Sequence, residues 1–202
     1  MLDDWTHHHG MVTEPPRTLL DLLQRTLPSS SAMEESLSAA RLDLGLAEEG
    51  SLSPACVAYA LLKRRTQPEE VSRLLSWREF EQLAAALLRA AGFVVKENLI
   101  LTKPRAQIDA VAFGTSIILC VDCKHYRREP GPASLQKFAT AQLRRSGLLR
   151  KKTDDPRPIA SVILSVSEPE GSFVEGVAVV PVRTLRSFLT SLDSYTELFE
   201  LR

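Results

Sequence analysis

The chain has 202 residues and a formal net charge of zero, with 44% hydrophobic and 25% charged residues. This composition excludes wholesale disorder, and no apolar stretch approaches the roughly 20 residues that a membrane helix needs. Three cysteines predict no disulfide framework. The acidic N-terminus does not read as a secretory signal, so we expect a protein of the reducing cytoplasm.

The zero net charge conceals a basic middle section. Residues 61–160 carry 19 Lys and Arg against 10 Asp and Glu, whereas residues 1–60 carry 3 against 9 and residues 161–202 carry 3 against 6. A basic surface attracts polyanions such as nucleic acids. Solvated helix faces would produce the same counts, so charge alone leaves both interpretations open.

The first 75 residues predict helices and no strand. We expect a disordered tail over residues 1–15 and a helical module over residues 16–75. Its third helix begins at Pro54, and a capping box at Thr66–Glu69 opens the fourth. The segment Ala55–Leu75 could read DNA as a helix-turn-helix. A packing or dimerising role, or a protein partner, fits the same pattern.

The clearest predicted helix begins after Ser76. Ser76 and Glu79 have the spacing of a capping box, and Gly92 marks the C-terminal stop. The apolar residues recur at i, i+3, i+4, i+7, i+8 and i+11, which is the spacing of a buried helical face: Phe80, Leu83, Ala84, Leu87, Leu88 and Ala91. At about 100° per residue, Glu81 falls beside this face, where an acid can reach from the helix to a sheet.

Three strands are predicted next. The first begins at Phe93 and continues towards Leu101. Two apolar runs, Ile108–Phe113 and Ile117–Cys123, then flank the break at 114–116 and predict a β-hairpin.

Three charged residues lie in this apolar hairpin, namely Asp109, Asp122 and Lys124. Because side chains alternate along a strand, Asp122 and Lys124 share one face, and a suitable register would bring Asp109 beside Asp122. Two adjacent carboxylates repel each other unless a cation lies between them. An all-oxygen site with few protein ligands suits Mg²⁺, and the ammonium of Lys124 could hold an anionic group beside it.

A basic amphipathic helix is predicted over residues 133–149, and it ends in the densest cationic cluster of the chain. Seven basic residues near the carboxylates are candidates for phosphate contacts: Lys103, Arg105, Arg144, Arg145, Arg150, Lys151 and Lys152. The alternative is a solubilising helix end. The adjacent carboxylates favour the phosphate interpretation.

Two further strands are predicted over residues 159–166 and 176–182, before a final helix. Because a strand that follows a helix implies a crossover, we predict an α/β fold with a mixed sheet, in which a meander is followed by parallel strands. Cys120 and Cys123 form a C-x-x-C pattern. On a strand these thiols point to opposite faces, so we predict that they do not share a metal ion.

The part of the chain from Trp77 to Tyr126 resembles the PD-(D/E)xK nuclease superfamily, and within it the branch of Mrr-like restriction endonucleases and archaeal Holliday-junction resolvases. The similar segments are WREFEQLAAALLRAAGFVV, QIDAVAF and CVDCKHY. In this family a helix carries a glutamate, one strand an aspartate, and the next strand D/E-x-K. The positions that match are Glu81, Asp109, Asp122 and Lys124. Ile108 departs from the pattern, which has a proline there.

The resemblance implies a restriction-endonuclease-like core over residues 76–202, with a central mixed β-sheet flanked by helices in the order α-β-β-β-α-β. The N-terminal all-helical module would be an extension of this core.

It also implies a Mg²⁺-dependent endonuclease acting on DNA, in which Mn²⁺ could substitute. Asp109, Asp122 and the backbone carbonyl of Cys123 would hold the metal, and Glu81 would bind a second ion or orient a water molecule. Lys124 would position the nucleophile or neutralise charge on phosphorus. A homodimer would allow both strands to be cut. The sequence leaves open a structural Asp122–Lys124 pair, a nuclease-fold protein that binds DNA with little cleavage, and a regulatory subunit.

Overall fold

A computed structural model of the chain describes residues 53–63, 66–126, 130–166 and 172–199. The tail predicted over residues 1–15 and the first two helices of the predicted N-terminal module lie outside these ranges. Within them, no helix combines the length and the apolar character that crossing a membrane requires.

A six-stranded mixed sheet forms the centre of the fold. Its strands are β1 Val94–Leu101, β2 Ala106–Phe113, β3 Ile118–Lys124, β4 Ile159–Ser165, β5 Ser172–Val174 and β6 Val177–Pro181. The strand order is β1-β2-β3-β4-β6-β5. The first three strands form an antiparallel meander, β4 and β6 add in parallel, and β5 pairs antiparallel with β6. The predicted meander with parallel additions is confirmed, whereas β5 was not predicted.

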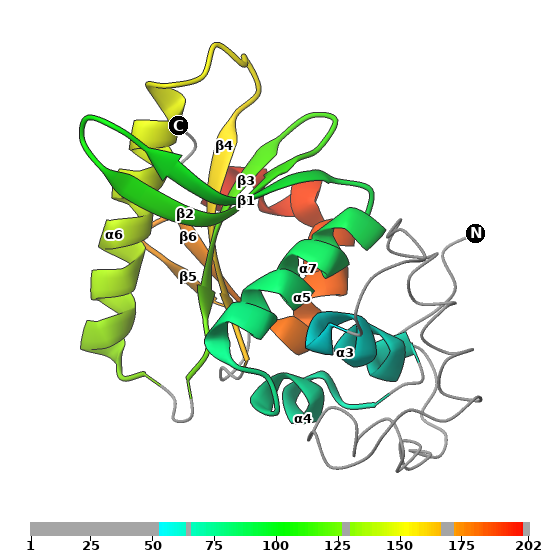
Figure 1. Cartoon of the computed structure of the whole chain (residues 1–202). Coiled ribbons are helices and arrows are strands. Elements are labelled where there is room, and N and C mark those ends of the chain that lie inside the picture. The colour runs from blue at the N-terminus through cyan, green and yellow to red at the C-terminus, as the bar shows by residue number, and fades with distance from the viewer. Residues whose placement is uncertain (1–52, 64–65, 127–129, 167–171, 200–202) are drawn as a thin grey trace.

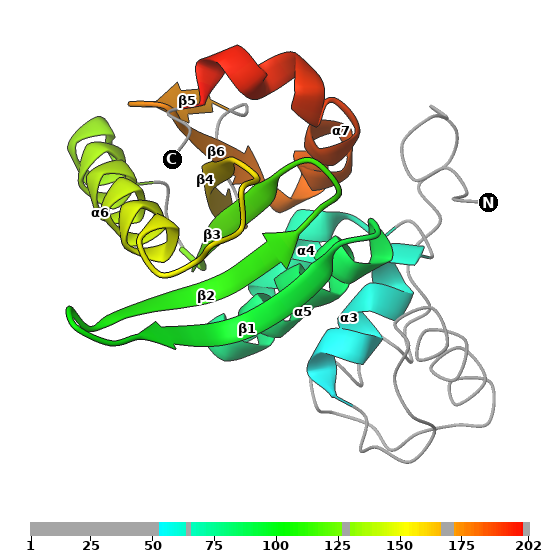
Figure 2. The same cartoon turned by 90° about the horizontal axis from the view of Figure 1, so that it is seen from above.

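Helices cover both faces of the sheet (Figures 1 and 2). Helix α6 (Pro132–Arg150) lies along one face. The other face carries α3 (Pro54–Lys63), α5 (Trp77–Ala90) and α7 (Leu185–Thr190), with α4 (Pro68–Arg73) at their end. Short 3-10 helices flank α7 at Val182–Thr184 and Leu192–Leu198. From α5 to β4 the elements follow the predicted order α-β-β-β-α-β, so the restriction-endonuclease-like core is confirmed.

Helices α3 and α4 pack into the same hydrophobic core as the sheet. All residues of α3 from 55 to 62 are buried in one cluster with Phe80 and Leu83 of α5. Val71 of α4 joins this cluster. The described part of the predicted helical module is therefore packed directly onto the sheet domain, and its role in DNA reading stays a prediction.

The capping box predicted at Thr66–Glu69 is wrong. Helix α4 begins at Pro68, so its N-cap is Gln67, whose side chain makes no capping hydrogen bond. Proline is favoured at the first helical position because it has no N–H to satisfy. This preference moves the N-cap one residue past Thr66, whose side chain is buried instead.

The capping box at the start of α5 is confirmed. Ser76 Oγ accepts a hydrogen bond from the Glu79 backbone N–H at 3.4 Å, and Glu79 Oε2 accepts one from the Ser76 N–H at 2.7 Å. Two N–H groups that have no partner inside the helix are thereby satisfied. The box fixes where α5 begins, and hence which residues of the helix face the sheet.

We expect Glu79→Ala to lower the free energy of unfolding by about 0.5–1 kcal/mol, because the reciprocal bond to Ser76 is lost. Glu79→Gln should cost much less, since an amide oxygen can accept the same hydrogen bond. Urea denaturation of both variants checks this expectation. Equal losses would mean that the charge at the helix start matters and the hydrogen bond does not.

The face of α6 that contacts the sheet is partly polar. Gln142 and Ser146 are both fully buried. Gln142 Nε2 donates to the backbone carbonyls of Cys120, at 2.6 Å, and Val162, at 3.3 Å. Ser146 shares a hydrogen bond with the hydroxyl of Ser161. These bonds tie α6 to β3 and β4 at fixed positions.

The two cysteines of the C-x-x-C pattern face opposite sides of β3. Cys120 is buried in the cluster on the α6 side, whereas Cys123 packs against the cluster on the α5 side. The predicted opposite orientation of the two thiols on β3 is confirmed by this arrangement.

Candidate active site

Asp109 and Asp122 lie on neighbouring strands. The antiparallel register of β2 and β3 ends with Ala110 opposite Val121. The Asp109 carboxylate then accepts a hydrogen bond from the N–H of Cys123, which places it beside Asp122. Asp122 and Lys124 each contact a side chain of α6, so they share one face of β3, as predicted. The meander thus brings together three of the four candidate residues.

The ladder between β1 and β2 is distorted beside Asp109. Asn98, which faces Asp109 across the ladder, has a φ of 49° and is skipped in the register. Ile108 and Val111 pack into the same cluster, although residues three apart on a regular strand point to opposite faces. At this break in alternation, Asp109 Oδ2 accepts a hydrogen bond from the backbone N–H of Cys123 at 2.8 Å.

Asp122 is 3% exposed and has a cation beside each carboxylate oxygen. Lys124 Nζ lies 2.7 Å from Oδ2, and Arg145 Nη1 lies 3.4 Å from Oδ1. The two cations come from different elements, β3 and α6. A buried carboxylate needs such partners because desolvation of an unpaired charge is costly.

Glu81 projects from α5 and is 7% exposed. Its Oε2 is buried and has no hydrogen-bond partner among the described residues. Burial, followed by the negative charge of Asp109, raises the pKa of Glu81 to about 7. Burial also raises the pKa of Asp109, against the opposing effect of the hydrogen bond from Cys123. The two groups are therefore electrostatically coupled neighbours.

Lys124 is positioned by aromatic side chains as well as by Asp122. Its Nζ lies 5.3 Å from the ring centre of Phe138 on α6, and Phe138 stacks on Tyr126 with centroids 5.5 Å apart. The next residue, His125, donates from Nε2 to the carbonyl of Ser72 at 2.8 Å. The end of β3 is thus fixed to α4 on one side and α6 on the other.

The donor chemistry at this site fits an oxygen-liganded metal ion. Within the described ranges, no three His, Cys, Asp or Glu side chains are gathered closely enough to hold an ion as they stand. The charges of Asp109 and Asp122 nevertheless raise the pKa of Glu81, and the charge of Asp122 also raises the pKa of Asp109. In addition, Glu81 Oε2 is buried without a hydrogen-bond partner among the described residues. A divalent cation would relieve both the repulsion between the carboxylates and the unsatisfied burial of Glu81 Oε2.

The pKa of Glu81 predicts how the metal-free protein responds to pH. Folded Glu81 keeps its proton up to about pH 7, whereas the ordinary value is 4.5. The folded state therefore binds more protons between these values, and the free energy of unfolding should fall as pH rises through this window. We expect a loss on the order of 1–2 kcal/mol.

Denaturation in EDTA at pH 5 and pH 8 measures this loss, and Glu81→Gln is the control that lacks the ionisable group. The variant should lose less stability than wild type between the two pH values. Identical losses would show that another group is responsible.

The predicted DNA-contacting residues fall into three groups. Arg145 contacts Asp122. Five lie exposed, on the second half of α6 and just beyond it or in the β1–β2 connection: Arg144, Lys151, Lys152, Lys103 and Arg105. Arg150 instead donates to the backbone carbonyls of Asp155 and Arg157, which holds the segment between α6 and β4.

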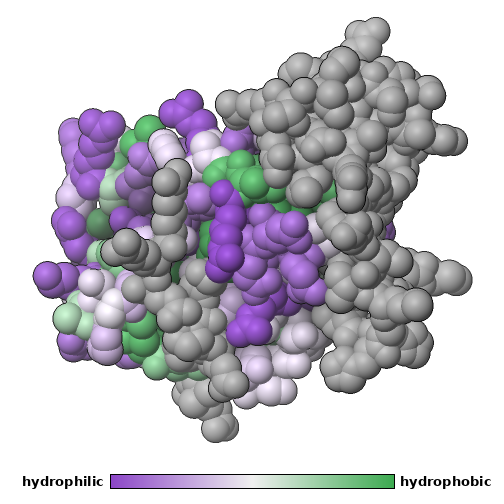
Figure 3. All heavy atoms as spheres, turned by 90° about the horizontal axis from the view of Figure 1, so that it is seen from below, coloured by the Kyte–Doolittle hydropathy of each residue, from purple (hydrophilic) through white to green (hydrophobic). Residues whose placement is uncertain are grey.

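The end of the sheet at which β3 stops is at the bottom of Figure 1. Among the described side chains visible from below, hydrophilic groups predominate and hydrophobic patches are smaller (Figure 3). This character suits a polar ligand better than an apolar one.

Several neighbours of the site have no distinguishing pattern in the sequence. Arg78 lies on the first turn of α5 and lowers the pKa of Glu81 by its charge. Phe138 contacts Lys124, and Gln142 contacts Arg145. A helical position facing the D-x-K strand is the only signal that could have identified them, and it depends on the tertiary structure.

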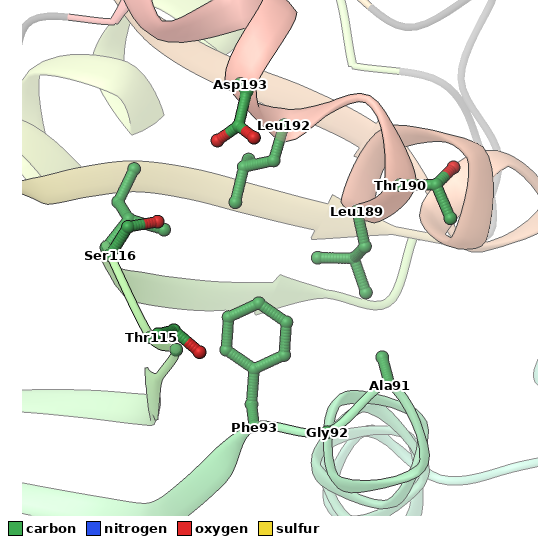
Figure 4. Close-up of a pocket in the computed structure, with 11 residues that line it drawn as sticks. Ala91, Gly92, Phe93, Thr115, Ser116, Leu189, Thr190, Leu192 and Asp193 are labelled. Atoms are coloured by element: carbon green, nitrogen blue, oxygen red, sulfur yellow. The ribbon is translucent and has the colours of Figure 1, made fainter.

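A pocket of about 220 Å³ lies at the opposite end of β3 from Lys124. It is lined by the end of α5, the β2–β3 turn, and the segment from α7 into the following 3-10 helix. The Phe93 ring points towards Leu189 and Leu192 (Figure 4). The same ring packs against Gly114, where an added Cβ would lie 2.7 Å from it. None of the candidate catalytic residues line this pocket.

Comparison with known proteins identifies the part of the chain that carries the site. Residues 72–148 match the family model described as restriction endonuclease, the Mrr catalytic domain. An uncharacterized protein of Archaeoglobus fulgidus is 28% identical over 129 residues, which cover 60% of this chain and 95% of the relative. The matched segment contains α5, β1 to β3 and most of α6. Residues 72–148 are therefore similar to the Mrr-type restriction endonuclease family, one of the PD-(D/E)xK nuclease families.

Proposed function

We propose that this protein is a Mg²⁺-dependent endonuclease that hydrolyses phosphodiester bonds of DNA. The observation that carries the proposal is the placement of Asp109, Asp122 and Lys124 together on β2 and β3, with Glu81 of α5 nearby. The Asp109 carboxylate accepts from the N–H of Cys123, next to Asp122, and Lys124 contacts Asp122 at 2.7 Å. Glu81 is electrostatically coupled to all three residues.

In this proposal Asp109, Asp122 and the backbone carbonyl of Cys123 hold the metal ion. Glu81 supplies a further carboxylate that completes the ligand set or orients the attacking water. When bound, Mg²⁺ supplies Lewis acidity at the phosphoryl oxygens. Lys124 presents its ammonium to the negative charge that develops on the phosphate in the transition state.

The local charges support this assignment. The three carboxylates share the site with three cations: Lys124 and Arg145 contact Asp122, and the charge of Arg78 acts on Glu81. Adding a divalent ion makes the site net positive, which favours an anionic phosphodiester. The basic residues exposed around the second half of α6 extend this potential over the surrounding surface.

The proposal is tested by nicking of supercoiled plasmid and of branched duplexes with Mg²⁺, with Mn²⁺ and with EDTA. Wild type should nick DNA only with a metal ion, and Asp122→Asn should not. Metal-independent DNA binding without cleavage would instead identify a nuclease-fold DNA-binding protein.

We further expect DNA affinity to depend steeply on salt. Each phosphate contact contributes about 0.9 to the slope of log K against log [salt] on duplex DNA. Replacing Arg144, Lys151 and Lys152 together by Gln should lower the slope by up to about 3. Arg150 is left intact because it holds backbone carbonyls.

Fluorescence anisotropy over a range of salt concentrations measures the slope. Lys96→Gln, which removes an exposed positive charge on β1, is the control and should change it little. An unaltered slope in the triple variant would remove this surface from the DNA interface.

A further inference from the structure

Arg145 occupies a place that the fold builds for it. Its Nη1 lies 3.4 Å from Asp122 Oδ1 and 3.4 Å from Gln142 Oε1. Gln142 is fully buried, and its amide nitrogen is held by the carbonyls of Cys120 and Val162. The oxygen that faces Arg145 is therefore fixed by two strands of the sheet.

The contact between Arg145 and Asp122 is nonetheless loose. Charged groups in close contact typically lie about 2.7–2.9 Å apart. Lys124 Nζ reaches this distance from Asp122 Oδ2, although without the geometry of a hydrogen bond, whereas Arg145 does not reach it. Both contacts of Arg145 use the same terminal nitrogen. The side chain is 28% exposed, so the guanidinium can reach solvent or a ligand without unfolding of α6.

A divalent ion at Asp122 would compete with cations that already face both of its oxygens. Lys124 faces one of its oxygens and Arg145 faces the other, and the carboxylate is almost fully buried. The longer and more exposed contact is the one to Arg145. Of the two cations, the guanidinium of Arg145 is therefore the one that would leave Asp122 more readily.

We infer that Arg145 exchanges partners. In the metal-free protein it neutralises Asp122, and once a divalent ion binds Asp122 it moves to a non-bridging oxygen of the DNA phosphodiester. This inference rests on the proposed function and adds a consequence to it. Because one side chain links the two events, metal binding and DNA binding strengthen each other by the same factor.

The first test is the affinity for Mn²⁺ without DNA, measured by titration calorimetry. Arg145→Gln removes the competing cation and should bind Mn²⁺ about five- to tenfold tighter than wild type. Arg144→Gln is the matched control, since it removes an equal charge from the neighbouring exposed position, and it should change the affinity less than about twofold. Affinity of Arg145→Gln equal to or weaker than that of Arg144→Gln would overturn the inference.

The second test is DNA affinity with Ca²⁺ and with EDTA, with the DNA shown to be intact on a gel. Wild type should bind DNA more tightly when Ca²⁺ is added. In Arg145→Gln, the factor by which Ca²⁺ raises the DNA affinity should be about tenfold smaller than in wild type. Arg145→Lys keeps the charge but not the planar guanidinium. It should bind Mn²⁺ like wild type yet show a reduced gain, and it serves as the second variant if Arg145→Gln folds poorly. An undiminished gain in both variants would contradict the exchange.

These outcomes separate the exchange from the proposed function. Wild type that shows both binding effects but never cleaves DNA would refute the nuclease proposal and leave the exchange intact. Metal-dependent cleavage by wild type, with no change in Mn²⁺ affinity in Arg145→Gln, would refute the exchange and leave the nuclease proposal intact.

Discussion

Replacing Asp122 with Asn should lower single-turnover cleavage by about 10³-fold or more, because the central anionic metal ligand is lost. The same change should lower the stability of the metal-free protein by about 1–3 kcal/mol. The reason is that Lys124 and Arg145 are left beside a neutral amide in a largely buried site.

Asp109→Asn is the matched comparison, because it should abolish cleavage without this loss of stability. Asp109 is hydrogen-bonded to the Cys123 N–H, and an Asn oxygen can accept the same bond. Burial raises the pKa of Asp109, so removing its charge relieves a cost. Chemical denaturation in EDTA and rapid-quench cleavage measure the two properties. Equal stability of the two variants would contradict the expectation that only Asp122→Asn destabilises the metal-free protein. Normal cleavage by either variant would show that its residue does not belong to the catalytic site.

Replacing Lys124 with Met should reduce cleavage by about 10²–10³-fold while metal binding is retained. The side chain of Met keeps the packing against Phe138 but cannot stabilise charge on the phosphate. Because the ammonium lies 2.7 Å from Asp122, its removal should leave the affinity for Mn²⁺ unchanged or increase it. The two effects together distinguish loss of a catalytic group from loss of the metal.

Lys96→Met, on the edge strand β1, controls for loss of a positive charge and should cleave at close to the wild-type rate. A Lys124→Met protein that cleaves normally would show that Lys124 is only the ion-pair partner of Asp122. A variant that loses its affinity for Mn²⁺ would show that Lys124 organises the carboxylates.

Local patterns were sufficient to predict the parts of the fold that depend on nearby residues. The box formed by Ser76 and Glu79 set the start of α5, and therefore the position of Glu81 at the edge of its apolar face. The two β-branched runs set the hairpin. Strand alternation then placed Asp122 and Lys124 on one face, because its period of two leaves no other arrangement.

The features that escaped prediction depend on contacts between distant elements. The distortion opposite Asn98 arises where β1 pairs with β2, so nothing in the local pattern around Asp109 revealed it. The burial of Gln142 depends on carbonyls of β3 and β4. The different roles of Arg145 and Arg150 follow from what each side chain meets, although composition placed both in one cationic cluster.

The most direct measurement is anomalous diffraction from a crystal of the protein containing Mn²⁺. The account predicts an anomalous peak between β2 and β3, bound by Asp109, Asp122 and the carbonyl of Cys123, with Arg145 moved away from Asp122. Mn²⁺ bound elsewhere, with Lys124 and Arg145 still on Asp122, would contradict it.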